Sequence, residues 1–280
     1  MKNFLRLAGS LLLVFLISFF LSGGHLPFSS EQLSPLKEKL PPLSLPATSK
    51  EKNALPSSEP ASPPEDGSGN AGALQRVSRF VFLPQAVSDR LRRANYTKID
   101  WIAPDLKNAI IAVEDSRFYS HIGIDLTAIA RAALVNLQYG EVTQGGSTIT
   151  QQLVKTLFLS QEQTIDRKIE EVMLALNLEA RCSKDEILEY YLNSIYFGSG
   201  FYGITDAASG YFGKTPGQLT LPEAAMLAGL PNAPSLYSPY EDFTLAKKRQ
   251  FIVLDAMVKN GFISAELADD AKRAPLILAR

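Results

Sequence analysis

This 280-residue chain has little cysteine and histidine, and its net charge is close to zero. Its single cysteine, Cys182, cannot form a disulfide within the chain, and the two histidines belong to no Cys/His cluster with zinc-site spacing. The formal net charge of -1 provides no overall electrostatic attraction for nucleic acid. These absences exclude a disulfide framework and a structural zinc site, and they predict that nucleic acid is not a partner.

Long apolar runs are also rare, apart from one at the N-terminus. Leu7 to Leu21 carries no charge and follows Lys2 and Arg6. Its length of about 15 residues lies between a signal-peptide core and a full membrane span, so cleavage stays open. Basic residues before the run favour a cytoplasmic N-terminus. We expect residues 1–24 to be a signal anchor or transmembrane segment, and the protein to cross the cell membrane once with its catalytic domain on the extracytoplasmic side.

Residues 25–75 are rich in Pro, Ser, Glu and Lys and have few large apolar side chains, which is typical of a linker without a core. Residues 76–280 are then expected to form one domain. At its start, the alternation of Val77, Phe80 and Phe82 predicts a short strand, followed by a helix over Ala86 to Arg93.

Helical periodicity dominates from Pro104 onward, and it predicts a mainly α domain. Ser183 with Glu186 and Thr220 with Glu223 have the spacing of capping boxes that begin helices. On another expected helix, four apolar residues at three-to-four spacing mark the side that faces the core: Ile165, Ile169, Val172 and Leu176.

Glu114 and Asp115 end an apolar helix in the pattern Glu-Asp-x-x-Phe-x-x-His-x-Gly, which runs to Gly123. A carboxylate at a helix C-terminus opposes the helix dipole, so its proton affinity rises and it suits a proton acceptor. A solvated helix end is the plain alternative. His121 on its own is more typical of a structural histidine, and together with Asp115 it is expected to orient the loop.

The segment from Gly145 to Gln152 places glycines and small hydroxyl groups before a helix that runs to Phe158. Such a helix N-terminus can bind phosphate, and Lys155 lies one turn inside to add a full charge. Ordinary capping would use the same Ser and Thr residues.

The same helix is strongly apolar toward its end. Because a small lobe cannot bury every side of a helix, we expect some of these residues to face lipid: Leu157, Phe158 and Leu159.

Arg167 and Glu171 share one helix face, next to Lys168. In isolation this spacing is typical of a solvated ion pair that contributes about 0.3–0.5 kcal/mol.

Taken in order, these segments resemble the successive motifs of the peptidoglycan glycosyltransferases (glycosyltransferase family 51), which include monofunctional transglycosylases and the glycosyltransferase part of class A penicillin-binding proteins. The match continues through Lys184 to Asn193, Ala207 to Lys214 and Glu223 to Gly229, so it covers roughly Trp101 to Ile263. The resemblance implies a lysozyme-like helical large lobe with a smaller membrane-facing jaw lobe, preceded by the N-terminal transmembrane anchor.

The resemblance also implies the chemistry, which is polymerisation of lipid II with inversion at the anomeric carbon and release of undecaprenyl pyrophosphate. Glu114 is then the catalytic base, and Glu171 positions the leaving group. The residues implied for binding sugar or pyrophosphate are Lys155, Arg167, Lys168, Ser147, Thr148 and Gln152. No cofactor is required, and a divalent cation (Mg or Mn) at the pyrophosphate stays open.

The expected partners are lipid II, the growing glycan strand, the cytoplasmic membrane and other cell-wall synthesis proteins. A lysozyme-like muramidase or lytic transglycosylase is the rival enzyme, because a glutamate in a helical lobe can also cleave the polymer. A non-catalytic, membrane-tethered glycan-binding protein is the alternative outside enzymes. Ser34 and Lys37 match the transpeptidase pattern Ser-x-x-Lys only within the linker, and no Lys-Thr-Gly partner is present. Whether the chain is a whole enzyme or part of a bifunctional one stays open.

Overall fold

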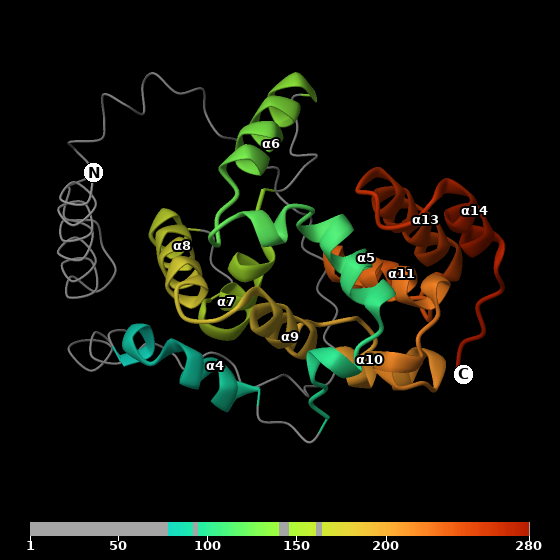
Figure 1. The fold of residues 1–280 in the computed structure, drawn as a ribbon, viewed down its shortest axis with the longest axis horizontal. Helices are drawn as coiled ribbons and strands as arrows, with labels where there is room; N and C mark the ends of the chain where they lie inside the picture. The colour runs from blue at the N-terminus through green and yellow to red at the C-terminus, as the bar shows by residue number, and fades with distance from the viewer. Residues whose placement is uncertain (1–77, 92–94, 140–145, 161–163, 280) are drawn as a thin grey trace.

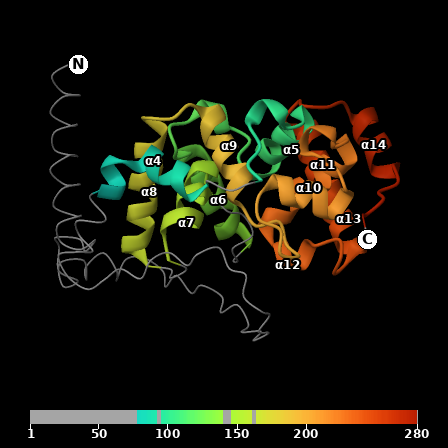
Figure 2. The same ribbon diagram turned by 90° about the horizontal axis from the view of Figure 1, so that it is seen from below.

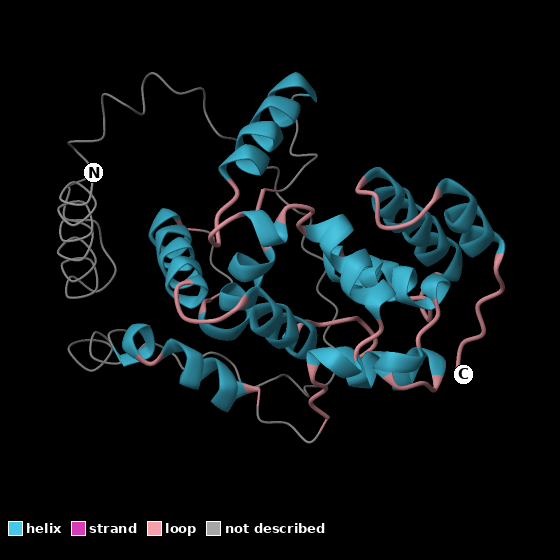
Figure 3. Ribbon diagram, in the orientation of Figure 1, coloured by secondary structure: helices cyan, strands magenta, loops and turns pink. Residues whose placement is uncertain are grey.

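The computed structural model describes residues 78–91, 95–139, 146–160 and 164–279, and for residues 133–139 the backbone alone. Within these ranges the regular elements are all helices, apart from an isolated bridge between Tyr196 and Tyr202 (Figure 3). The expected mainly α fold is therefore confirmed. None of the described helices has the length and apolarity needed to span a membrane. The expected anchor, residues 1–24, and the linker, residues 25–75, lie outside the described residues.

One group of helices surrounds α11 (Leu221–Gly229). It packs against α5 (Pro104–Glu114) and α13 (Phe243–Lys259), and α14 (Ala265–Arg273) covers α13 (Figure 1). The fully buried Ala224 and Ala228 give α11 a small cross-section, which allows neighbouring helices to approach closely. Its N-terminus is held by the Glu223 side chain, which accepts a hydrogen bond from the Thr220 amide at 2.8 Å. The predicted capping box is confirmed.

A second group of helices surrounds α7 (Ile149–Phe158). It packs against α8 (Ile165–Glu179) and α9 (Lys184–Ser194), and α4 (Leu83–Arg90) lies across α8 (Figures 1 and 2). The capping box of Ser183 and Glu186 begins α9, as predicted. The two groups are connected by α10 (Ile204–Phe212), which contacts both α9 and α11.

The remaining elements are short or stand apart. α6 (Leu126–Tyr139) projects from the two groups in Figure 1. α12 (Pro234–Tyr237) is a single turn, and the 3-10 turns are η1 (Ile99–Trp101), η2 (Phe118–Ser120), η3 (Pro216–Gln218) and η4 (Leu230–Asn232).

The strand predicted from Val77, Phe80 and Phe82 is wrong, because residues 78–81 are helical and lead into α4. The pattern that determines this segment is the i, i+4 pair Leu83 and Val87, both fully buried. The backbone there is bound to α8, since Asn177 donates a 2.8 Å hydrogen bond to the Phe80 carbonyl.

The core-facing side predicted for α8 is also wrong. Ile165 is 73% exposed, and Ile169, Val172 and Leu176 are only half-buried. The buried side carries Leu174 and Leu178 together with polar residues that periodicity counts as solvent-facing. Glu170 and Glu171 are paired with arginines there, and the Asn177 amide nitrogen is bonded to the Phe80 carbonyl, although the Asn177 Oδ1 atom has no hydrogen-bond partner among the described residues.

The exposure predicted for Leu157, Phe158 and Leu159 is wrong as well, because they are only 8%, 4% and 4% exposed. Two arginines from the α4 region cover them. Arg90 donates to the Leu157 carbonyl at 2.6 Å and lies 4.9 Å from the centre of the Phe158 ring, and Arg79 donates to the Phe158 carbonyl at 3.0 Å. With α8 and α9 packed against it and Arg79 and Arg90 bonded to its C-terminal end, α7 has all its apolar side chains buried among the described residues.

Candidate active site

Glu114 is the last residue of α5, and its side chain lies between the two helix groups. Burial raises the pKa of its carboxyl above the ordinary value. A hydrogen bond from Gln152 and the charge of Arg249 oppose that rise, whereas the adjacent Asp115 adds to it. The sequence analysis predicted a raised proton affinity from the helix dipole, and in the structure the largest cause of the raised pKa is burial. A carboxylate with raised pKa suits a general base.

A cavity of about 250 Å³ opens at Glu114. Its walls come from both helix groups, because α7 and α8 face η4 across it. The lining residues are Glu114, Ser147, Gln151, Gln152, Lys155, Glu171, Pro231 and Asn232. The structure thus brings together five of the residues predicted from the sequence: Glu114, Ser147, Gln152, Lys155 and Glu171.

Gln152 contacts Glu114 directly. Its amide nitrogen donates a 2.8 Å hydrogen bond to the Glu114 Oε2 atom. Lys155 lies one turn further along α7, is exposed, and brings a positive charge to the same cavity. A carboxyl group of raised pKa and a cation therefore line the same cavity.

A cluster of charges forms the α8 wall of the cavity. Glu171, only 2% exposed, is paired with Arg167 at 3.1 Å and is also bound by Lys168. Lys168 donates a further hydrogen bond of 3.2 Å to the Ser147 hydroxyl. The buried Nε atom of Arg167 has no hydrogen-bond partner among the residues that the structure describes. The cluster carries a net positive charge, and the low exposure of Glu171 distinguishes it from a solvated surface pair.

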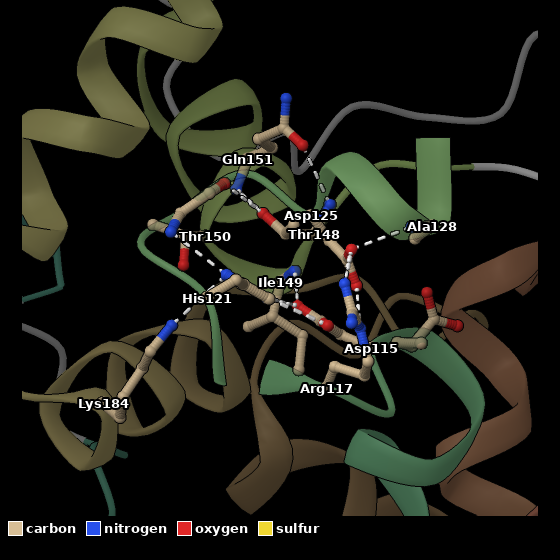
Figure 4. A network of polar contacts seen from close by, with 12 residues as sticks. Asp115, Arg117, His121, Asp125, Ala128, Thr148, Ile149, Thr150, Gln151 and Lys184 are labelled. Carbon is tan, nitrogen blue, oxygen red and sulfur yellow. Dashed lines mark hydrogen bonds and ion pairs between the residues drawn. The ribbon is translucent and has the colours of Figure 1, made fainter. Parts of the chain in front are cut away.

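Asp115 and His121 do not line the cavity, and their side chains point toward each other (Figure 4). The Nε2 atom of His121 is 2.9 Å from the Asp115 Oδ2 atom, and the Ile149 amide donates to the same oxygen at 3.0 Å. The Nδ1 atom of His121 accepts from the Gly123 amide at 3.1 Å, so Nε2 carries the proton. Asp115 therefore links the end of α5 to the beginning of α7.

Thr148 is part of this link and does not line the cavity. Its hydroxyl donates to the Gly123 carbonyl at 2.7 Å and accepts from the Gln151 amide as the cap of α7 (Figure 4). Thr148 therefore serves as the N-terminal cap of α7, which was the alternative to phosphate binding in the sequence analysis. The structure does not place it in the cavity with the other residues predicted to bind sugar or phosphate. Gln151, its capping partner, lines the cavity instead.

Besides Gln151, four residues near Glu114 were not predicted from the sequence. Pro231 and Asn232 lie in η4, and Arg249 on α13 is held by a 3.2 Å hydrogen bond to the Gly229 carbonyl. Tyr191 on α9 is fully buried and donates to Gln152. Asn232 and Arg249 were missed because they follow the last motif used in the sequence analysis. Tyr191 lies inside a matched motif, but it carries no charge that would have indicated a role.

The donor set does not fit a resident divalent ion. Both carboxylate oxygens of Glu171 are engaged by cationic side chains. Across the described part of the chain, no group of three or more His, Cys, Asp or Glu residues is arranged to hold a metal ion.

Comparisons with known proteins agree on one family. A family model described as "Transglycosylase" matches residues 83–258. Penicillin-binding protein 1A of Aquifex aeolicus is 46% identical over 68% of this chain and 26% of its own length, and that of Escherichia coli is 50% identical over 62% and 20%. A protein of Cupriavidus necator named as a candidate transglycosylase is 47% identical over 66% of this chain and 79% of its own length.

The chain spans about a quarter or less of the length of these two penicillin-binding relatives. The matched residues include Glu114, the cavity walls and η4. The chain belongs to the transglycosylase family.

Proposed function

We propose that this chain is a peptidoglycan glycosyltransferase that polymerises lipid II into glycan strands. The observation that carries the proposal is the pairing, in one cavity, of a carboxyl whose pKa is raised by burial with a cation-bearing wall. A sugar transfer with a pyrophosphate leaving group needs both a proton acceptor and positive charge. Family membership adds the reaction class, since the relatives are named as penicillin-binding proteins and a transglycosylase.

In this proposal Glu114 removes the proton from the 4-hydroxyl of the acceptor N-acetylglucosamine. The hydroxyl oxygen forms a bond to the anomeric carbon of the growing chain, and the bond from that carbon to the pyrophosphate oxygen breaks. The electron pair leaves with undecaprenyl pyrophosphate, and the configuration inverts from α to β. Gln152 holds one oxygen of Glu114 at 2.8 Å and leaves the other available for the proton.

Lys155 and the α8 cluster would stabilise the charge that develops on the pyrophosphate. Lys155 lines the cavity, and Lys168 is 3.2 Å from Ser147, which lines it too. Charge-assisted hydrogen bonds to phosphate are among the stronger polar contacts in proteins. Glu171 would position the two cations of its own helix, Arg167 and Lys168, and no step is routed through a metal ion.

Asp115 and His121 are proposed to orient the loop after α5. Their contacts to each other and to the Ile149 amide fix the beginning of α7 against the end of α5. That link sets the distance between Glu114 and Gln152, which come from these two helices.

The rival muramidase reading is tested by offering both substrates to the full chain in detergent micelles. We expect labelled lipid II to be polymerised and purified glycan strands to be left intact. Lys155→Ala should reduce polymerisation at least tenfold, because a charge-assisted contact to the leaving group is lost. Lys259→Ala, a surface lysine near the end of α13, is the matched control. Release of muropeptides without polymer would refute the proposal.

The membrane arrangement is also proposed, with residues 1–24 as anchor, a lysozyme-like large lobe and a jaw lobe that faces the bilayer. Since Leu157 to Leu159 are buried, the membrane-facing surface is assigned to exposed apolar residues before and within α6. Ile122 is 74% exposed, Leu126 75% and Ile129 42%. Large apolar side chains that are exposed within one short segment are typical of contact with lipid.

Flotation of the protein with liposomes tests this arrangement. Replacing Ile122, Leu126 and Ile129 with Ser in a chain that begins at residue 76 should reduce flotation. The same replacement of Ile252 and Leu267, exposed residues on α13 and α14, serves as control and should leave flotation unchanged. Equal flotation of both variants would contradict the assignment.

A further inference from the structure

Behind the proposed base lies a side chain that the reaction scheme does not use. Tyr191 is fully buried on α9, and its hydroxyl donates a 3.0 Å hydrogen bond to the Gln152 Oε1 atom. The amide of the same Gln152 donates to Glu114 at 2.8 Å. Tyr191 does not line the cavity, so it would not touch substrate there.

These two hydrogen bonds give the Gln152 side chain one favourable orientation. An ionised carboxylate only accepts hydrogen bonds, so the amide nitrogen of Gln152 has to face Glu114. The amide oxygen then faces Tyr191, whose hydroxyl has a proton to donate. In the reversed orientation an amide oxygen would face the carboxylate and the tyrosine proton would point at an amide nitrogen, which has no free lone pair to accept it.

Tyr191 is suited to act as a permanent donor. Burial raises its pKa well above the ordinary value, and the negative charges of Glu114 and Asp115 add to the effect. The hydroxyl therefore keeps its proton at neutral pH and can act as the donor there.

We propose that Tyr191 is a positioning residue that, through Gln152, holds Glu114 ionised and directs its free oxygen into the cavity. The inference deepens the proposed function and rests on it for its catalytic meaning. The hydrogen-bonded order itself, from Tyr191 to Gln152 to Glu114, is independent of the reaction.

Other groups also act on Glu114, and they set what Tyr191 can change. Asp115 follows it on the chain and Arg249 approaches from α13. Lys155 and Glu171 line the same cavity from α7 and α8. All of these stay in place when only the Tyr191 hydroxyl is removed, so a change in the Glu114 titration would report the relay.

The direct test is a carboxyl 13C NMR titration of the full chain in detergent micelles, with the Glu114 signal assigned by its absence in Glu114→Gln. In Tyr191→Phe we expect Glu114 to titrate at higher pH than in the wild type, because the donor that fixes Gln152 is lost. Tyr190→Phe, the neighbouring half-buried tyrosine on α9, is the matched control and should leave the titration unchanged. A Glu114 titration identical in Tyr191→Phe and wild type would overturn the inference.

A second variant guards against misfolding of Tyr191→Phe. Gln152→Met removes the middle of the relay from a partly exposed position and should shift the Glu114 titration in the same direction. Adding Tyr191→Phe to Gln152→Met should then cause no further shift, since the two residues act through one contact. An unchanged titration in Gln152→Met, or additive shifts in the double variant, would overturn the inference.

The rate of lipid II polymerisation separates this inference from the proposed function. In Tyr191→Phe the acid limb of the kcat profile should move to higher pH, with kcat about tenfold lower on that limb and KM unchanged. A uniform loss of kcat at every pH would show a merely structural role and contradict the inference. If the wild type makes no polymer, the proposed function fails, and the NMR titration still decides the relay.

Discussion

Truncating the Phe158 side chain should lower the stability of the folded domain and should not change its binding to lipid. The side chain is 4% exposed, and the Arg90 guanidinium lies 4.9 Å from its ring centre. Removing a buried phenylalanine costs about 3–5 kcal/mol, a range that covers the lost apolar burial and the cavity left behind. The cation–π contact with Arg90 contributes about 0.5–2 kcal/mol within that loss.

For a domain of this size, each kcal/mol lowers Tm by about 2–4 °C. Phe158→Ala should therefore lower Tm by about 6–20 °C in a thermal melt followed by circular dichroism. Ile165→Ala is the matched control, because Ile165 is 73% exposed on the neighbouring helix. It should change the free energy of unfolding by no more than about 0.5 kcal/mol.

The opposite pattern would refute this reasoning. If Phe158→Ala melts within about 2 °C of the wild type, the side chain contributes little to the core. If it also loses flotation with liposomes, Phe158 faces lipid after all, and the cover provided by Arg79 and Arg90 is not present in the folded protein.

Three further predictions concern charged groups. Because burial raises the Glu114 pKa, ionisation of Glu114 lowers the stability of the folded protein increasingly as pH rises above the ordinary glutamate range. Glu114→Gln should therefore be more stable than the wild type at neutral pH, and the difference should vanish in acid. Urea unfolding at the two pH values measures this. Burial opposes a low pKa for Glu223, but hydrogen bonds from Lys214 and Thr220 hold its pKa below the ordinary value. The stability that these hydrogen bonds provide is therefore present above the ordinary glutamate pKa and is lost as pH falls through the pKa of the folded state. Lys214→Met should destabilise at pH 7 and less so in acid, and equal effects at both would contradict this. Asp115→Asn should cost about 1.5–3 kcal/mol of unfolding free energy, because the carboxylate accepts from both His121 and the Ile149 amide; a loss below about 0.5 kcal/mol would show that the link is dispensable.

Local sequence signals predicted the helices well where capping residues mark their ends. Ser183 with Glu186 and Thr220 with Glu223 form the boxes that their spacing indicates. The helical class followed from periodicity alone. The resemblance then placed Glu114, Gln152 and Lys155 in one site, and the structure brings these three to one cavity.

Burial was predicted less well, because it depends on which helices meet. α8 buries Glu171 and Asn177 and leaves Ile165 exposed, contrary to simple amphipathic reasoning. Periodicity identifies an apolar stripe, but it cannot show that paired polar groups will occupy the interface instead. Phe158 is a similar case, since the arginines that cover it lie more than sixty residues away along the chain.

The sequence analysis missed the uncharged side chains near Glu114 for a different reason. Tyr191 contacts Gln152 from a helix that follows α8, and only packing of α7 against α9 brings the two together. Asn232 lies in a short 3-10 turn with no periodic pattern to indicate its direction. Such contacts are set by tertiary structure, and nothing in the local sequence predicts them.

Catalysis by Glu114 is tested most directly by polymerisation of labelled lipid II with the purified 280-residue chain. Glu114→Gln removes the proton acceptor with little change in volume, and Glu241→Gln changes an exposed glutamate as control. We predict that Glu114→Gln lowers kcat by at least about 10²-fold, within the range of general-base contributions, while Glu241→Gln polymerises like the wild type. A Glu114→Gln variant that folds and polymerises lipid II at a near-normal rate would contradict the account.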